Sequence, residues 1–251
     1  MSPLDEYRRK RDFTKSPEPA GRAVPAPKPR KTRAKPLFFC VQKHLASHLH
    51  YDLRLEHNGV LLSWAVPKGP SLDPSIKRLA MHVEDHPIEY GTFEGVIPEG
   101  YGAGIVMLWD EGTWLPEVED VDQALAKGDL KFTLDGYKLK GSWALVRTRG
   151  YGDSRNDGRS WLLIKHRDEW SGDLDIATFA PLSVKSESDF AEILAENNPD
   201  IWKSNKPVKT GETSKLLGEV IEQAAAIKVA RAARKRPAAK GSGRKVKAKA
   251  R

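Results

Sequence analysis

The chain has 251 residues, 39% of them hydrophobic, and a formal net charge of +8. This length suits one domain with tails or two small domains. The longest apolar runs fall far short of the ~20 residues that a membrane-spanning helix needs, and the N-terminus lacks the apolar core of a secretory signal. The single cysteine, Cys40, cannot form an internal disulfide, which favours a reducing cytoplasm.

The positive charge is concentrated at the two ends. Residues 228–251 hold eleven basic and no acidic residues, and residues 1–35 hold eleven basic and four acidic ones, which leaves −10 for residues 36–227. Basic ends of this kind are typical of binding to polyanions through counterion release, and a tail that only improves solubility is the alternative. An acidic body that contains histidines also suits a metal site, because the cation offsets the carboxylates.

The first 36 residues are predicted to form a basic strap or linker. Residues 4–13 could form a short helix or lie across the body, with Tyr7 and Phe13 as anchors. Residues 16–36 are rich in Pro, Ala, Lys and Arg, a composition typical of an extended linker.

Residues 37–170 are predicted to form a β-rich domain. Glycine-containing turns indicate two hairpins, one around Asn58-Gly59 in residues 49–66 and one around Asp135-Gly136, in which residues 137–139 begin the second strand. The remaining strands are expected at residues 37–43, 78–84, 104–110, 142–149 and 160–165, with one short helix at residues 118–127. About eight strands with tight turns predict a mainly β protein, a compact antiparallel β-barrel with short helices and basic, partly disordered tails. A β-sandwich is the main alternative.

After Trp170 the sequence pattern predicts helices instead of strands. Residues 188–197 fit a short helix with apolar residues at helical spacing, and residues 213–236 fit a second helix. We assign residues 171–227 to a helical extension. The Lys-, Arg-, Ala- and Gly-rich residues 228–251 are assigned to a disordered basic tail.

Residues 49–56 alternate strictly between apolar and polar side chains, as in a half-buried strand. A generic polar face carries Thr, Lys, Ser or Glu, whereas this one carries imidazole, carboxylate and guanidinium groups. His50 and Asp52 are about 7 Å apart along the backbone, so both can reach one cation. His44, just upstream, could supply a third ligand. Two imidazoles and one carboxylate with open positions suit a catalytic Mn²⁺, Fe²⁺ or Zn²⁺.

Other side chains near this strand suit phosphate binding. Arg54 follows on the same polar face, and its guanidinium matches the geometry of a phosphate. His86 is placed at the end of the next polar strand, and Tyr90 follows shortly after it. Lys68 lies in a rigid Pro-Lys-Gly-Pro turn and could contact phosphate. Considered singly, Lys68, His86 and Tyr90 are each more typical of a structural role than of a functional one.

Other polar features carry no predicted chemistry. Cys40 lies in an apolar run and is interpreted as a buried small side chain, whereas His48 and His82 are interpreted as surface residues. The chain has no Walker loop, dinucleotide fingerprint, zinc-type cysteine pair or Gly-x-Ser-x-Gly elbow.

Several segments, in the same order, resemble the 3′-phosphoesterase domain of bacterial DNA ligase D. They are residues 7–13 with 17–19, 42–56, 63–74, 83–87, 93–100 and 161–165 with 167–168, which together span roughly residues 4–170. The resemblance implies a compact β-barrel and a manganese-dependent enzyme acting on 3′ ends during end-joining repair. Two activities are implied. One removes a terminal ribonucleoside and leaves a 3′-phosphate, and the other removes that phosphate and leaves a 3′-OH.

The resemblance also implies roles for individual residues. His44, His50 and Asp52 match the metal ligands, and the residues that match contacts to the scissile phosphate are Arg54, His86 and Tyr90. The predicted substrate-binding residues are Arg11, Asp12 and Glu18, which match residues needed for the ribonucleoside step, together with Gln42 and Lys68. The predicted DNA-binding residues of the tail are Arg231, Arg234, Lys235, Arg236, Lys240, Arg244 and Lys245.

The implied partners are DNA 3′ ends in primer–templates, a separate ligase or polymerase, and end-binding repair proteins. The expected location is the bacterial cytoplasm at the nucleoid, with no membrane contact. Without an adenylate-transfer ligase motif, the chain is expected to be a stand-alone member. Two alternative functions remain. One is a non-catalytic DNA-end adaptor that recruits repair factors through its basic C-terminus, and the other is a metal-dependent RNA-processing cyclic phosphodiesterase.

Overall fold

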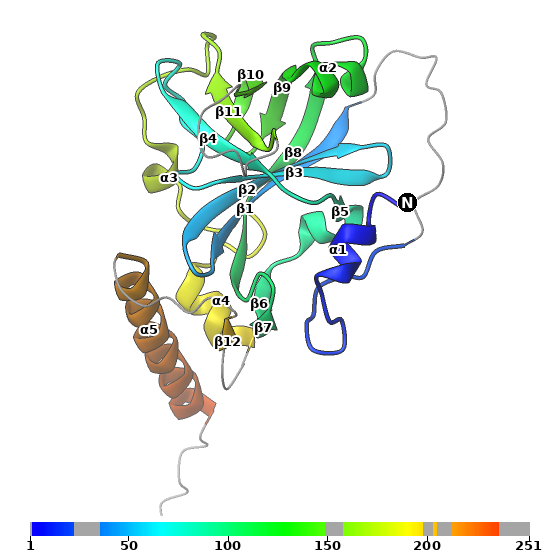
Figure 1. Ribbon diagram of the computed structural model, residues 1–251. Coiled ribbons are helices and arrows are strands. Elements are labelled where there is room, and N and C mark those ends of the chain that lie inside the picture. Colours follow the sequence, from blue (N-terminus) through cyan, green and yellow to red (C-terminus); the bar gives the residue numbers. More distant parts are fainter. Residues whose placement is uncertain (1, 23–35, 149–157, 198–202, 205–211, 236–251) are drawn as a thin grey trace, which may run out of the picture.

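Eight antiparallel strands close into a barrel in the computed structural model (Figure 1). The structure describes residues 2–22, 36–148, 158–197, 203–204 and 212–235. The strands run around the barrel in the order β1, β2, β3, β4, β11, β10, β9, β8, and β8 pairs back onto β1. Their bounds are β1 Leu37–Leu45, β2 Leu49–His57, β3 Val60–Val66, β4 Lys77–His82, β8 Gly104–Pro116, β9 Asp129–Gly136, β10 Lys140–Arg147 and β11 Ser160–Lys165. The closed ladder confirms the predicted barrel over the sandwich.

Short elements decorate the barrel. The remaining strands are β5 His86–Pro87, β6 Gly95–Ile97, β7 Glu99–Gly100 and β12 Lys203–Ser204. The helices are α1 Asp5–Arg9, α2 Val121–Lys127, α3 Ile176–Phe179, α4 Phe190–Asn197 and α5 Glu212–Lys235, with a 3-10 turn, η1, at Ile88–Thr92. None of the helices in the described residues combines the length and apolar character that a bilayer crossing requires.

The barrel core is aromatic and aliphatic. Trp64, Trp109, Trp114 and Trp143 are at most 1% exposed and fill its interior. Successive strand residues point to opposite faces. On β2, the apolar residues predicted from the alternation therefore face this core, and the polar residues face outward. A β-bulge shifts the register of β1 against β8 between residues 41 and 42. The extra residue is Trp109, so β8 is the strand that such a bulge bends.

One of the two predicted hairpins is confirmed and the other is displaced. Asn58 and Gly59 have φ values of 48° and 82°, as a two-residue turn between β2 and β3 requires. The second turn falls at residues 137–139, which the sequence analysis had wrongly made a strand. The Asp110 carboxylate accepts the Lys138 and Leu139 N–H groups at 2.9 and 2.8 Å, and this tertiary contact fixes the turn there.

The N-terminal segment docks against the barrel beside β5 (Figure 1). Leu4 and Tyr7 are 1% and 0% exposed, which confirms Tyr7 as an anchor, and the Phe13 ring lies 5.8 Å from that of Tyr7. The helix covers only residues 5–9 and is therefore shorter than the predicted helix over residues 4–13. Residues 23–35, most of the predicted linker, lie outside the described residues.

The C-terminal helices largely match the prediction. The helix predicted at residues 213–236 is α5, whose Val220 and Ala224 are buried. Residues 228–235, assigned above to the disordered tail, are helical, because Ala, Lys and Arg are strong helix formers. The predicted DNA-binding residues Arg231, Arg234 and Lys235 therefore lie on α5. The other four, Arg236, Lys240, Arg244 and Lys245, lie outside the described residues.

Three side chains given no chemical role also have defined places. Cys40 is buried and His48 is exposed, as predicted. His82 is not a surface residue. It is half-buried, with its ring 5.0 Å from that of Trp64 and 6.3 Å from that of Trp161, because β4 places it opposite Trp64 in the ladder.

Candidate active site

A cavity of about 270 Å³ lies over the outward-facing side of β1 and β2. The β1–β2 register sets His44 opposite His50 and Gln42 opposite Asp52, so that four polar residues distant from the core become neighbours. The rest of the wall comes from residues 83–90, from the glycine-rich loop at residues 100–103, and from Arg11 of the N-terminal segment.

His44, His50 and Asp52 form a group whose ligand atoms all lie within 4.8 Å of one another. His44 Nδ1 is 3.8 Å from Asp52 Oδ2, and His50 Nε2 is 3.6 Å from Asp52 Oδ1. The opposite ring nitrogens are already engaged, since His44 Nε2 donates to Gly102 O at 3.0 Å and His50 Nδ1 donates to His48 O at 2.9 Å. Backbone carbonyls thus fix both tautomers and leave one lone pair per ring facing Asp52. This donor set fits a divalent transition metal.

The charge of Asp52 is secured by its neighbours. Although burial raises it, the pKa of the Asp52 carboxyl is held far below its ordinary value by Arg54 and by the two histidines. Burial also lowers the pKa of His50, against the pull of Asp52, which favours its neutral, ligating form. Asp52 and His50 are therefore predisposed to the protonation states that metal binding requires.

Arg54 is 3% exposed and is fixed on three sides. Its Nε donates to Gln42 Oε1 at 2.7 Å, its Nη1 to Ser63 Oγ at 2.8 Å and its Nη2 to Asp52 Oδ2 at 3.1 Å. One N–H on each Nη remains beyond these bonds, and Arg54 lines the cavity. A phosphate in the cavity would meet a guanidinium whose orientation is already set.

Gln42 supports the site from behind. It is fully buried and does not line the cavity. Its amide nitrogen donates to the carbonyls of Tyr90 and Phe93 at 3.0 and 2.8 Å, while its oxygen accepts from Arg54. Gln42 therefore orients Arg54 and ties η1 to β1, which differs from the substrate contact predicted for it.

His86 and Tyr90 meet Arg54 at the buried end of the cavity. His86 Nδ1 donates to Glu84 O at 2.9 Å, so its Nε2 lone pair accepts from Arg11 Nη2 at 3.1 Å. Burial and the adjacent Arg54 and Arg11 hold the pKa of His86 well below 6.5. Tyr90 is 2% exposed, its ring lies 4.9 Å from the Arg54 guanidinium carbon, and burial raises its pKa well above 10.

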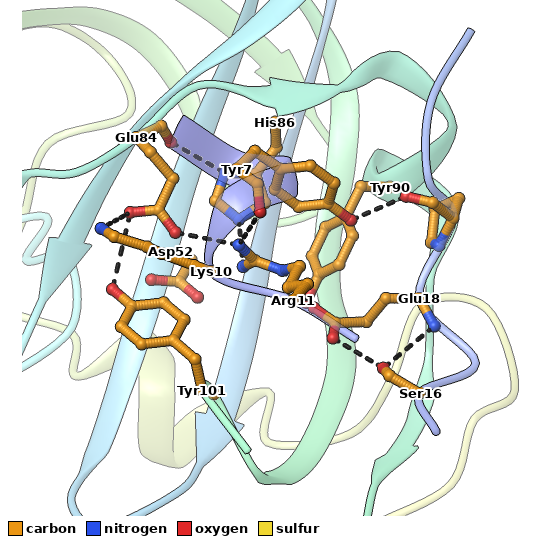
Figure 2. A network of polar contacts seen from close by, with 12 residues as sticks. Tyr7, Lys10, Arg11, Ser16, Glu18, Asp52, Glu84, His86, Tyr90 and Tyr101 are labelled. Carbon is orange, nitrogen blue, oxygen red and sulfur yellow. Dashed lines mark hydrogen bonds and ion pairs between the residues drawn. The ribbon is translucent and has the colours of Figure 1, made fainter. Parts of the chain in front are cut away.

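The N-terminal segment closes one side of the cavity through Arg11 (Figure 2). Besides His86, the Arg11 guanidinium contacts Glu18 Oε1 at 2.8 Å and Glu84 Oε1 at 3.1 Å. Lys10 Nζ adds a second contact to Glu84, at 2.9 Å. Arg11, matched to the ribonucleoside step by resemblance, thus contacts both His86 and Glu18, which is matched to the same step.

Two predicted substrate-binding residues lie apart from this network. Asp12 is exposed, and its Oδ1 accepts from the backbone and hydroxyl of Thr14 at 3.1 and 2.6 Å. Lys68 is exposed on the turn after β3, and neither residue lines the cavity. The structure adds Ser63, Glu84 and Tyr101 to the surroundings of the site. The signal for Glu84 was its place in the matched segment 83–87, and that for Tyr101 was the glycine-rich loop.

Sequence comparisons relate the segment that carries this site to proteins of known family. Residues 42–147 match the family model of the DNA ligase D 3′-phosphoesterase domain. A multifunctional non-homologous end joining protein LigD from Pseudomonas aeruginosa is 48% identical over 214 residues, which are 84% of this chain and 24% of that protein. The chain resembles the 3′-phosphoesterase domain of DNA ligase D.

Two mycobacterial relatives give the same result. The LigD proteins of Mycobacterium bovis and Mycolicibacterium smegmatis are 46% and 41% identical over 148 and 172 residues, or 59% and 66% of this chain and 18% and 21% of those proteins. The chain therefore spans about a quarter or less of the length of these DNA ligase D relatives. His44, His50, Asp52, Arg54 and His86 all fall inside the 42–147 match, whereas Arg11 and Glu18 precede it.

Proposed function

We propose that the protein hydrolyses phosphate esters at the 3′ ends of DNA, as a metal-dependent end-healing enzyme in non-homologous end joining. The observation that carries the proposal is the cavity in which the His44–His50–Asp52 group lies beside a fixed Arg54, inside the segment that matches the DNA ligase D 3′-phosphoesterase domain. The substrates are a 3′-phosphate and a 3′-terminal ribonucleoside on a primer–template, and both reactions lead toward a ligatable 3′-OH.

The side chains divide the work of phosphoester cleavage. Mn²⁺ held by His44, His50 and Asp52 would supply a Lewis acid next to the phosphoryl group. Arg54 directs its remaining N–H groups to the equatorial oxygens, where charge develops, and needs no reorganisation because Gln42, Ser63 and Asp52 already hold it.

His86 serves first as a positioning group. Its Nδ1–H is committed to Glu84 O, and its Nε2 carries a lone pair that Arg11 occupies, so this form has no proton to donate to a leaving oxygen. A proton on Nε2 is opposed by the positive charges of Arg54 and Arg11 until an anionic phosphate offsets them. In the free protein His86 therefore positions Arg11, and it can hydrogen-bond the phosphate or act as an acid only after the bound phosphate has let Nε2 take up a proton.

The basic C-terminus holds DNA without reading its bases. Arg231 and Arg234 on α5, and the basic residues after it, provide charges for counterion release. The N-terminal segment contributes differently, because Arg11 and Glu18 reach the cavity itself. Loss of residues 1–20 should therefore impair ribonucleoside removal more than phosphate removal.

The test is incubation of 5′-labelled primer–templates that end in a 3′-phosphate or a single 3′-ribonucleotide with Mn²⁺, followed by gel analysis. We expect conversion of both to the shorter or dephosphorylated strand, and no conversion by Asp52→Ala. Binding without conversion by the wild type would contradict the proposal and favour a DNA-end adaptor. Cleavage of cyclic phosphates on RNA alone would favour an RNA-processing phosphodiesterase.

A further inference from the structure

Tyr101 is an aromatic side chain that the proposed chemistry does not use. It lies in the glycine-rich loop between β7 and β8, lines the cavity and is 43% exposed. The other tyrosine of the cavity wall, Tyr90, is 2% exposed. Among the described residues that line the cavity, Tyr101 therefore presents the accessible aromatic face. A partly exposed ring on the wall of a polar cavity is accessible to a ligand in that cavity.

The ring is held in a defined place (Figure 2). Lys10 Nζ lies 4.8 Å and the Arg11 guanidinium carbon 5.4 Å from its centroid, and its hydroxyl donates to Glu84 Oε2 at 3.5 Å. The next residue, Gly102, accepts the hydrogen bond from His44 Nε2 at 3.0 Å. The position of the ring is thus coupled to the metal group through one residue of backbone.

The loop conformation depends on its glycines. Gly100 and Gly102 have φ values of 92° and 78°, which side-chain-bearing residues rarely adopt. This backbone turns Tyr101 toward the cavity. The ring, fixed by its contacts with Lys10, Arg11 and Glu84, offers a flat and partly exposed surface to a ligand.

A nucleobase is the ligand that this surface fits. Bases stack on aromatic side chains without sequence preference, and nucleic-acid channels combine such rings with cationic groups for the phosphates. Here the ring stands beside Lys10 and Arg11 and borders the same cavity as Arg54 and the metal group. Because Lys10 and Arg11 of the N-terminal segment lie beside this ring, the space next to Tyr101 suits one terminal nucleoside better than a continuing strand.

On the basis of the proposed function, we propose that Tyr101 is the stacking platform for the base of the 3′-terminal nucleoside, the group that leaves in the diester reaction. A 3′-phosphate end has no leaving base. Tyr101 therefore acts as a specificity residue that favours ribonucleoside removal and leaves phosphate removal unaffected. A platform for the base that stays on the primer would affect both reactions equally.

The kinetic test compares Tyr101→Ala and Tyr101→Phe on three primer–templates, ending in an ordinary 3′-ribonucleotide, a 3′-terminal abasic ribose and a 3′-phosphate. Loss of one stacked base corresponds to a roughly 5- to 150-fold lower kcat/KM. We expect this loss for Tyr101→Ala on the first substrate only, and restoration by Tyr101→Phe, which keeps the ring. The control is Tyr137→Ala, because Tyr137 is 74% exposed on the β9–β10 turn and does not line the cavity. Equal losses on all three substrates, or no loss on the first, would overturn the platform.

A binding readout separates this inference from the proposed function. Primer–templates with 2-aminopurine as the 3′-terminal base are titrated with protein in EDTA. Stacking on Tyr101 should quench the fluorescence in the wild type, Tyr101→Phe and Tyr137→Ala, and not in Tyr101→Ala. Quenching that depends on Tyr101 in a protein that releases no product would support the platform and refute the phosphoesterase. If the protein releases product but the fluorescence is quenched equally in the wild type and Tyr101→Ala, or is not quenched in either, the platform is refuted and the phosphoesterase activity is not.

Discussion

Arg54 and Lys165 are both buried cations paired with an aspartate, yet only Arg54 borders a cavity. The side chain of Lys165 is fully buried. Its Nζ donates hydrogen bonds to Asp168 Oδ2 and to the carbonyls of Ser142 and His166. Asp168 in turn accepts the N–H groups of Ser142 and Trp170. The three ammonium donors of Lys165 and both oxygens of Asp168 are therefore used within the protein.

The Asp52–Arg54 pair is left incomplete. Asp52 Oδ1 lies 3.6 Å from His50 Nε2, and Asp52 Oδ2 lies 3.8 Å from His44 Nδ1, which is too far for hydrogen bonds. Both ring nitrogens carry a lone pair, because the other nitrogen of each ring donates its N–H to a backbone carbonyl. The difference teaches that a buried ion pair marks a functional site when its ligand atoms converge without satisfying one another.

The largest effect is expected for His50→Ala. His50 is half-buried on the cavity wall and is not part of the hydrophobic core, so the free energy of unfolding should change by less than about 1 kcal/mol. Loss of a residue that hydrogen-bonds a metal ligand already costs about 10- to 100-fold, so loss of a ligand itself should lower phosphate release by more than about 100-fold. Phosphate release and urea unfolding measured on the same preparation check both values. Full activity in this variant would disprove the metal assignment.

Lys165→Met should have the opposite profile. Removal of one partner from a buried pair costs about 3 kcal/mol, at the lower end of the usual range because Asp168 is partly exposed. The turnover number should stay at the wild-type value at temperatures where the variant is folded. The matched control is Lys140→Met, which breaks the exposed Lys140–Asp135 contact of 2.9 Å and should cost less than about 1 kcal/mol. Equal destabilisation by both would contradict the structural role of Lys165.

Arg11→Met should raise the pKa of His86. Burial and the positive charges of Arg54 and Arg11 keep this pKa well below 6.5, so removing one charge and opening the cavity both shift it upward. The measurement is an NMR titration of the His86 ring carbons in metal-free wild type and variant, with Arg9→Met as the control because the His86 contact belongs to Arg11 and not to Arg9. An unchanged midpoint would show that Arg11 does not act on His86.

The smallest effect on chemistry is expected from removal of residues 236–251, which carry seven basic residues and leave α5 intact. Each neutralised phosphate contributes roughly −0.9 to the slope of log affinity against log salt, so partial engagement of this tail predicts a slope flatter by about three. Affinity across a salt series should show this change while turnover at saturating DNA stays constant. Reduced turnover with unchanged affinity would make the tail part of the active site.

The sequence predicted the features that depend on local patterns. The period-two alternation of residues 49–56 separated Asp52 and Arg54 from the core, because strand side chains alternate whatever the topology. The Asn58-Gly59 turn was recognised for a similar reason, since its φ values are a property of those two residues.

What the sequence could not predict depends on tertiary contacts. Arg11 meets Glu84 and His86 across 73 and 75 residues, and only the folded chain brings Glu84 and Tyr101 onto the wall of one cavity. The β9–β10 turn moved because Asp110, on another strand, binds its N–H groups. The sequence predicts His82 as a surface residue, whereas the pairing of β4 with β3 places it opposite Trp64.

Binding of Mn²⁺, followed by the electron paramagnetic resonance signal of the free ion, tests the contrast between the two aspartate pairs most directly. We predict one tightly bound ion per wild-type chain, the same ion in folded Lys165→Met, and its loss in His50→Ala and Asp52→Ala. Retention of the bound ion with unchanged affinity in His50→Ala and Asp52→Ala would contradict the account, because the unsatisfied ligand atoms in the cavity would then not be a metal site.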